Sequence, residues 1–493
     1  MKSGRYVYLG AVLAALVIGL GLWNPLHVKA NPDPAPRFVV DPFWPQILPA
    51  PVGYNLYTWP TPTAGDNVAH QWVTGEVAGS CTDAAGNVYT FNRGWEVGVS
   101  VGGVLQGNQS GAIVGQDAIA SSMPSPPVVE YDADGKVITG FGNPMLIQTG
   151  TNYGDSAYLP HGAHGCFVDY QGNLWVGGNG DGVIQKYNPA TAASQGAAAT
   201  WSVEIGQKGV CDGNPSSAVI NPTCGEANSL NTSHTLLNEP PDMSVDPDVG
   251  PVSGTRGDVY IADGYGNHRI VVFGTSDGGM TYHYVGQWGQ DCMHNESPDG
   301  SNPCPGGTFG HSGGGHPHCV VLGNDGLVYV CDRPNNRIQA FKKSCAKPSV
   351  NGSQPLCDPE RIIYVNNFPG ASTAKRNAIL KAGTRACDID FWPTRDTVAS
   401  GSPMPQKYVV DVDLGNDNTW IIDKASGITV GALGRCGLAP CPGHNAGEFA
   451  FGSRVLLQIF RSKPQTVNPF SEIVEGLLLR HFERKQGFRP DQV

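Results

Sequence analysis

Two segments of this chain repeat one pattern. Asp258–Phe273 reads DVYIADGYGNHRIVVF, and Leu327–Phe341 reads LVYVCDRPNNRIQAF. Each contains a β-rich apolar run, an aspartate, a polar turn with Asn and Arg, and a second apolar run. Repetition of such a unit means that the fold is assembled from similar supersecondary blocks. The pattern therefore restricts the chain to a repetitive β architecture before any single residue is interpreted.

More copies of the unit appear when segments are aligned on the turn glycines Gly86, Gly172 and Gly326. Eight positions before each glycine, or at the matching place in the segment between, the residues are Ala78, His164, Pro241 and His318. Segments near Asp388 and Arg454 supply two further copies. Six copies of a four-stranded unit predict an all-β, six-bladed β-propeller.

The composition agrees with such a fold. The 493 residues include 66 Gly and 39 Pro, and only 15% are charged, which suits a β protein with many turns. The net charge of −11 argues against a nucleic-acid partner, because phosphate binding requires a basic surface.

The termini differ from the repeats. Lys2 and Arg5 precede an 18-residue apolar run, Tyr6–Trp23, and Val28–Ala30 resembles a small-residue cleavage site. We expect residues 1–30 to be a signal peptide or an N-terminal membrane anchor, since about 17–25 apolar residues span a bilayer. Residues 31–65 form a Pro-rich lead-in, 66–460 the propeller, and 461–493 an atypical tail with helical spacing. The protein is then secreted or periplasmic, and meets a membrane only through its N-terminal segment.

The thirteen cysteines fit an oxidising destination. Eight form close pairs in polar loops, and we expect loop-stapling disulfides there, although spacing alone does not fix connectivity. These pairs are Cys211/Cys224, Cys292/Cys304, Cys345/Cys357 and Cys436/Cys441. The other five lie in apolar, strand-like runs and are expected to be buried free thiols. They are Cys81, Cys166, Cys319, Cys331 and Cys387.

Equivalent residues of different blades form a ring around a propeller axis. His164 and His318 would lie about 120° apart in alternating blades of a six-fold ring. Three protein ligands and one open position are typical of catalytic zinc. The two histidines are therefore candidate zinc ligands, and the alternative is a pair of channel imidazoles that bind water or a carbonyl.

Several segments resemble one family. YLPHGAHGCFVDYQGNLWV, DVYIADGYGNHRIVVF, HPHCVVLGNDGLVYVCDRPNNRIQAF and GNVYTFNRGWEV resemble the peptidyl-α-hydroxyglycine α-amidating lyases, which are NHL-type six-bladed propellers. The resemblance implies cleavage of a C-terminal α-hydroxyglycine to an amide and glyoxylate, by a monomer. It also implies that His164 and His318 bind zinc, that Tyr265 is the catalytic base and that Arg93 stabilises the site. A phenol serves as a base only where a nearby cation favours its phenolate.

The chain departs from the family in its last blade. Arg454 stands where the resemblance places a third zinc histidine, and a guanidinium has no lone pair for a metal. His161, His316 and His444 are the possible substitute ligands. A propeller that has lost the lyase activity, or a shifted reading frame near Arg454, would also explain the departure.

Two functions from different classes follow. The first is an exported, zinc-dependent lyase that acts on an N-(α-hydroxyalkyl) amide, peptide or small molecule. The second is a non-catalytic NHL propeller that binds a peptide, glycan or protein partner. A calcium-dependent lactonase is disfavoured, because the channel positions are His rather than carboxylates. Calcium is possible at Asp411–Asn418, DVDLGNDN, but this segment lacks the Glu of a calcium loop and a solvated turn is expected.

Overall fold

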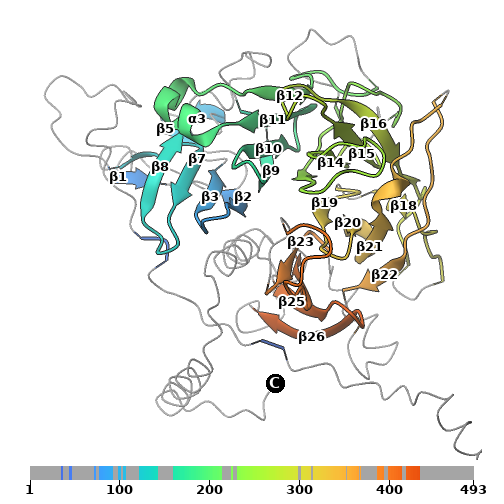
Figure 1. Cartoon of the computed structure of the whole chain (residues 1–493). Coiled ribbons are helices and arrows are strands. Elements are labelled where there is room, and N and C mark those ends of the chain that lie inside the picture. The colour runs from blue at the N-terminus through green and yellow to red at the C-terminus, as the bar shows by residue number, and fades with distance from the viewer. Residues whose placement is uncertain are drawn as a thin grey trace, which may run out of the picture.

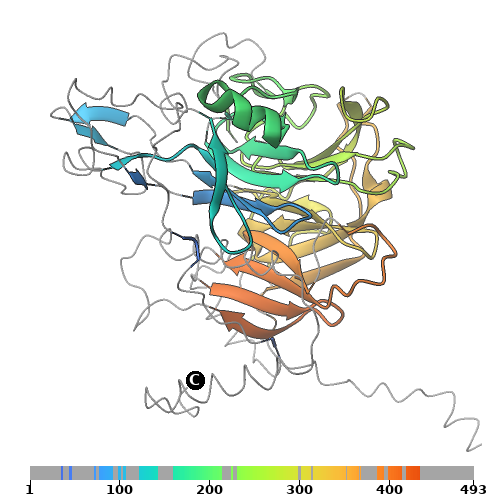
Figure 2. The ribbon, with the colours of Figure 1, turned by 60° about the vertical axis from the view of Figure 1, so that its left-hand side comes forward.

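The protein is an all-β propeller. The computed structural model describes residues 71–433 with gaps, the longest being 107–121, 143–158, 214–223 and 368–385, and two short stretches at 35–36 and 44–46. Within these residues, five four-stranded antiparallel sheets follow one another along the chain. Figure 1 shows them arranged as a ring of blades. The turned view in Figure 2 shows the same succession from the blue first sheet to the orange fifth sheet.

The blades have the following strands. Blade 1 contains β2 (Val77–Thr82), β3 (Val88–Asn92), β7 (Val128–Tyr131) and β8 (Val137–Phe141). Blade 2 contains β9 (Ala163–Val168), β10 (Leu174–Gly178), β11 (Val183–Tyr187) and β12 (Val203–Gly206). Blade 3 contains β13 (Asp242–Val245), β14 (Val259–Asp263), β15 (Arg269–Gly274) and β16 (His283–Trp288). Blade 4 contains β19 (Cys319–Leu322), β20 (Leu327–Asp332), β21 (Arg337–Lys342) and β22 (Arg361–Tyr364). Blade 5 contains β23 (Asp388–Trp392), β24 (Tyr408–Asp413), β25 (Asn418–Asp423) and β26 (Ile428–Leu433).

Smaller elements accompany the blades. Three two-stranded sheets pair β1 (Gln71–Val73) with β6 (Ser122–Pro124), β4 (Gly98–Val101) with β5 (Val104–Gln106), and β17 (Gln290–Asp291) with β18 (Thr308–Phe309). The short helix α3 covers Pro189–Gln195, with the Asn188 side chain accepting a hydrogen bond from the Thr191 amide at its start. None of the helices among the described residues is long and apolar enough to cross a membrane.

A buried ion pair explains the repeated Asp and Arg of the sequence pattern. Asp263 ends β14 and Arg269 begins β15, and their Oδ2 and Nε atoms lie 2.8 Å apart. Asp332 and Arg337 occupy the same places in blade 4, at 2.7 Å. All four side chains are fully buried. Because a buried charge must be paired, the two residues fix the hairpin between the second and third strands.

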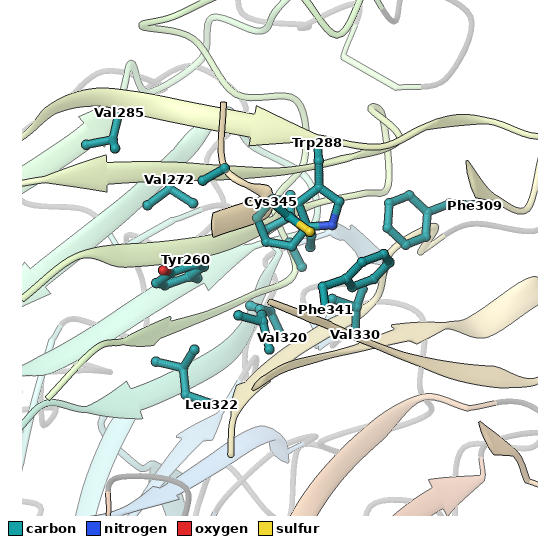
Figure 3. Close-up of a cluster of buried hydrophobic side chains, with 14 residues drawn as sticks. Tyr260, Val272, Val285, Trp288, Phe309, Val320, Leu322, Val330, Phe341 and Cys345 are labelled. Carbon is teal, nitrogen blue, oxygen red and sulfur yellow. The ribbon is translucent and has the colours of Figure 1, made fainter. Parts of the chain in front are cut away.

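Apolar side chains fill the space between neighbouring blades. Tyr260, Val272 and Trp288 of blade 3 pack with Val320 and Phe341 of blade 4 in one core cluster (Figure 3). Alternate residues of each strand face this cluster, as expected for sheets packed face to face. Burial of this apolar area is the main force that holds adjacent blades together.

Five disulfides are present among the described residues, and such bonds are typical of exported proteins. Three of the predicted loop staples form: Cys211–Cys224, Cys292–Cys304 and Cys345–Cys357. The fourth, Cys436/Cys441, lies outside the described residues.

The prediction of five buried free thiols was wrong for four of them. Cys319 and Cys331 are direct partners on β19 and β20, so their side chains share one face of the sheet and join. Cys81 of β2 and Cys166 of β9 join two neighbouring blades. Cys387 keeps its thiol and is buried.

The described part of the chain contains five blades. The expected sixth, around Arg454, lies outside the described residues, as do the predicted tail at 461–493 and the N-terminal segment 1–30. The propeller fold is therefore confirmed, but the described residues form five blades rather than the expected six.

The expectation of a solvated turn at Asp411–Asn418 was wrong at its first residues. Asp411 and Asp413 belong to β24 and are fully buried. Asp413 accepts a hydrogen bond from the Trp420 indole at 2.8 Å. Burial raises the pKa of Asp411 well above its usual range, and the charges of Asp413 and Asp388 add to this. All six residues of β24 are buried, so both faces of this strand are covered and neither aspartate reaches solvent.

Candidate active site

The innermost strands of the blades lie side by side. β9 contacts both β2 and β13, and β19 contacts both β13 and β23. The approach is close, because a Cβ at Gly79 would lie 2.1 Å from the His164 carbonyl oxygen. Residues at the start of these strands are thereby brought around one centre, as the alignment of Ala78, His164, Pro241 and His318 predicts.

His164 and His318 meet at this centre. Their ring centroids are 4.8 Å apart, with the rings at 71°. The phenol oxygen of Tyr265 lies 3.5 Å from Nε2 of His164 and 3.1 Å from Nε2 of His318. The structure thus brings together three residues that the sequence analysis selected from three different blades.

Hydrogen bonding fixes the tautomer of His318. Its Nδ1 lies 2.5 Å from the carbonyl oxygen of Cys387. Because a carbonyl only accepts, Nδ1 carries a proton and Nε2 of the neutral ring presents a lone pair. In this state the Tyr265 hydroxyl donates to Nε2 of His318.

A cation that the sequence analysis missed completes the group. Arg333 donates from Nη1 to the Tyr265 phenol oxygen at 3.0 Å. Burial alone would lower the pKa of Arg333, but the neighbouring Cys387 and Tyr265 raise it above its usual range. The guanidinium is therefore charged and stabilises negative charge on the phenol oxygen. The sequence did contain a signal for Arg333. This residue follows Asp332 in the turn of blade 4 that is equivalent to the blade 3 turn with Tyr265.

The Tyr265 turn is held by backbone hydrogen bonds on both sides. The Tyr265 amide donates to the Glu239 carbonyl at 3.1 Å, and the Gly266 amide donates to the Asn238 carbonyl at 3.1 Å. Asp263 accepts from the amide of Asn238 at 2.7 Å and from the side chain of Asn267 at 2.7 Å. The phenol is thus positioned by the same aspartate that pairs with Arg269.

The Tyr265 turn also contacts the segment that precedes His318. The His316 amide donates to the Gly264 carbonyl at 2.6 Å. A Cβ at Gly264 would lie 1.7 Å from the Pro317 carbonyl oxygen, so only glycine allows this approach.

Glu239 lies beside the site. It is half-buried and has a positive φ of 58°, which is uncommon for a residue other than glycine. Burial raises the pKa of Glu239 to about 7, and the charge of Asp263 adds to the effect.

His316, a possible substitute ligand, is directed elsewhere. Its ring stacks on His268 with centroids 4.4 Å apart and planes at 2°. Burial lowers the pKa of His316 to about 3, with a further contribution from His268. The other predicted site residues, Arg93, His161 and His444, lie outside the described residues.

The geometry of His164 and His318 fits a zinc ion. Zinc is bound by neutral imidazole nitrogens, and a ligating histidine usually donates its other N–H to a carbonyl or carboxylate. His318 does so through Nδ1. Two imidazole nitrogens directed at one point would hold the metal, which would supply Lewis acidity to a substrate oxygen.

A separate Cys/His group also has metal-like spacing. The ligand atoms of Cys292, His294 and Cys304 lie within 4.8 Å of one another. Cys292 and Cys304 are joined by a disulfide, however, with an S–S distance of 2.02 Å. Because metals bind thiolates rather than disulfide sulfurs, this group is not a metal site while the bond persists.

The five sheets define the fold as a β-propeller, and one segment of the chain matches a repeat found in such proteins. The NHL repeat model matches residues 315–341, which run from the segment before His318 to Phe341 in β21. Over 322 residues, 63% of this chain, the sequence is 26% identical to mouse peptidyl-glycine alpha-amidating monooxygenase. It is 32% identical over 133 residues, 27% of this chain, to the rat peptidylglycine alpha-amidating monooxygenase. The chain spans 26% of the mouse protein and 11% of the rat protein in these matches.

Solved propellers resemble this chain distantly. Virginiamycin B lyase from Staphylococcus aureus is 11% identical, with a TM-score of 0.32 over 74% of this chain and 71% of the lyase. The periplasmic gluconolactonase of Pseudomonas aeruginosa is 12% identical, with a TM-score of 0.34 over 75% of this chain and 73% of that protein. The fold assignment rests on the five sheets described above.

Proposed function

We propose that this protein is an exported, zinc-dependent lyase with a six-bladed propeller, which cleaves an N-(α-hydroxyalkyl) amide to an amide and glyoxylate. One observation carries the proposal. The Tyr265 phenol oxygen lies between Nε2 of His164 and Nε2 of His318 and accepts a hydrogen bond from Arg333. A base, a cation and two metal-type imidazoles thus converge on one point. The resemblance to the amidating lyases supports the same reaction class, and the two monooxygenases to which the chain is similar are likewise named for α-amidation.

The residues can move the required proton. Tyr265 acts as the base and takes the proton of the substrate hydroxyl, with the Arg333 guanidinium beside its oxygen. The electron pair of that O–H bond forms the carbonyl of glyoxylate as the C–N bond breaks. The electron pair of the C–N bond goes to nitrogen, which receives the proton back from Tyr265 and leaves as a primary amide. No net proton is consumed, so Tyr265 acts first as base and then as acid.

The proposal includes a cation that the sequence analysis did not name. Arg93 was the predicted cation, and Arg333 is the cation that contacts Tyr265 among the described residues. The Nη1 atom of Arg333 lies 3.0 Å from the phenol oxygen of Tyr265. The guanidinium can therefore stabilise negative charge on that oxygen without moving during the reaction. We therefore propose that Arg333 stabilises the Tyr265 oxygen, while the role predicted for Arg93, which lies outside the described residues, stays a prediction.

The test uses the purified full chain with α-hydroxyhippurate as substrate. We expect close to one zinc per chain after dialysis, and release of glyoxylate and benzamide. Tyr265→Phe should keep the zinc and lose glyoxylate release, whereas His164→Ala and His318→Ala should each lose the zinc. His316→Ala is the control and should retain it, since its ring packs on His268. A folded protein without zinc and without glyoxylate release would refute the lyase and favour the non-catalytic propeller.

A further inference from the structure

Cys387 occupies the position in blade 5 that His318 occupies in blade 4. The His318 amide donates to the carbonyl of Cys331, and the Cys387 amide donates to the carbonyl of Val412. Cys331 and Val412 are themselves equivalent, because each precedes the final aspartate of the second strand of its blade. Each ring residue also stands directly before its inner strand, β19 or β23. Cys387 is therefore the fifth-blade member of the ring that contains His164 and His318.

Two contacts place Cys387 at the site. Its carbonyl oxygen lies 2.5 Å from Nδ1 of His318. Its thiol also interacts with Arg333. Among the groups that raise the pKa of that guanidinium, Cys387 contributes most and Tyr265 comes next. The side chain is buried and keeps its thiol, while ten of the described cysteines are in disulfides.

The chemistry of the position suits a metal. Thiolate and imidazole together are common zinc ligands, with Zn–S of about 2.3 Å and Zn–N of about 2.0–2.1 Å. Cysteine binds metal as the thiolate. Arg454 stands where the resemblance places the third zinc histidine, and arginine does not ligate.

We infer that Cys387 is the third protein ligand of the metal held by His164 and His318, which makes a two-histidine, one-cysteine site. This inference rests on the proposed metal site. In the described part of the chain, the three donor atoms do not all lie within 4.8 Å of one another. Binding therefore includes a rotation of the Cys387 side chain, which moves its sulfur by up to about 3 Å between staggered rotamers.

Cobalt(II) substitution of the full chain tests the inference without an activity assay. Cobalt bound to a thiolate shows an intense charge-transfer band in the near ultraviolet, and cobalt bound only by nitrogen and oxygen does not. We expect this band in the native protein, and its loss in Cys387→Ser together with a rise in the cobalt Kd of more than about tenfold, since even outer-shell partners cost that much. The matched control is the double variant Cys436→Ser, Cys441→Ser, which should keep the band.

The possible failures are distinct. Cobalt binding with visible d–d bands but no charge-transfer band would overturn the role of Cys387 and leave the proposed lyase intact. Absence of cobalt binding in the native protein would overturn both. If Cys387→Ser does not fold, alkylation of native protein decides: metal should slow the reaction of Cys387 with iodoacetamide, and equal rates with and without metal would refute the assignment.

Discussion

Replacing Arg269 with leucine should remove a large part of the stability of the propeller. The Arg269 guanidinium pairs with Asp263 at 2.8 Å and donates to Ser233, Gln287 and Leu236 at 2.8–2.9 Å. Leucine fills part of the volume but leaves the Asp263 carboxylate buried without its cation. Breaking one side of a buried ion pair costs about 3–5 kcal/mol in the free energy of unfolding.

The magnitude can be checked by urea denaturation followed by circular dichroism. Lys342→Ala is the matched control, because Lys342 pairs with Glu360 at 2.8 Å with side chains that are 63% and 44% exposed. An exposed pair contributes about 0–1 kcal/mol, so this variant should unfold close to the native protein. Adding Asp263→Asn to the Arg269 variant should recover part of the loss, because of the two buried carboxylates that face Arg269 only Asp212, at 3.6 Å from Nη2, then remains. A loss below about 1 kcal/mol for Arg269→Leu would refute the reasoning.

The loss in the Arg269 variant should also depend on pH. Burial already raises the pKa of Asp263 in the native protein, and removal of the opposing cation raises it further. An acid whose folded-state pKa is raised binds its proton more tightly when folded, so stability falls as pH rises through that pKa. The variant should therefore lose less stability near pH 4 than at pH 7.

Three further predictions concern single features. Trp288→Ala empties the core between blades 3 and 4, and should cost about 3–5 kcal/mol in urea unfolding; a change below 1 kcal/mol would show that the blades do not depend on this packing. Replacing Cys81 and Cys166 with serine removes the covalent link between blades 1 and 2 and should cost about 2–5 kcal/mol, measured as a lowered Tm. The pKa of Glu239 is raised to about 7, so its contribution to stability is present at pH 4 and lost as pH rises through 7. Glu239→Gln should flatten the fall in Tm between pH 5 and pH 8, and an unchanged pH profile would contradict the raised pKa.

The sequence was sufficient to predict the ring of blades and the meeting of its histidines. The repeated Asp and Arg revealed the second hairpin of blades 3 and 4, and counting back from Gly172 and Gly326 selected His164 and His318. Such counting works because the inner strands begin at the same level in every blade. The counting carried no information on the distance between the two imidazole rings. That distance depends on how closely the backbones of neighbouring blades approach, as at Gly79 and His164.

The disulfide errors have a physical cause. Cys319 and Cys331 are 12 residues apart, the same separation as in the loop pair Cys345–Cys357. Spacing therefore could not separate a bond across a hairpin from a loop staple. Strand pairing decides the question, because Cys319 and Cys331 are direct partners of an antiparallel ladder.

Arg333 was missed because its turn differs in length from that of Tyr265. Six positions separate Asp263 from Arg269, but five separate Asp332 from Arg337. Alignment on the aspartate places Arg333 opposite Gly264, where no functional side chain was expected. The identity of the cation at the phenol required the three-dimensional arrangement of the two turns.

The contact between Gly264 and Pro317 has a consequence for how the site tolerates change. The gap between the base and its neighbouring imidazole is set by two main chains in van der Waals touch, rather than by side chains that can rearrange. A single added methyl group at Gly264 would act as a wedge between the two turns and push the phenol and the imidazole apart. Substitution there should therefore lower turnover, although position 264 takes no part in the chemistry.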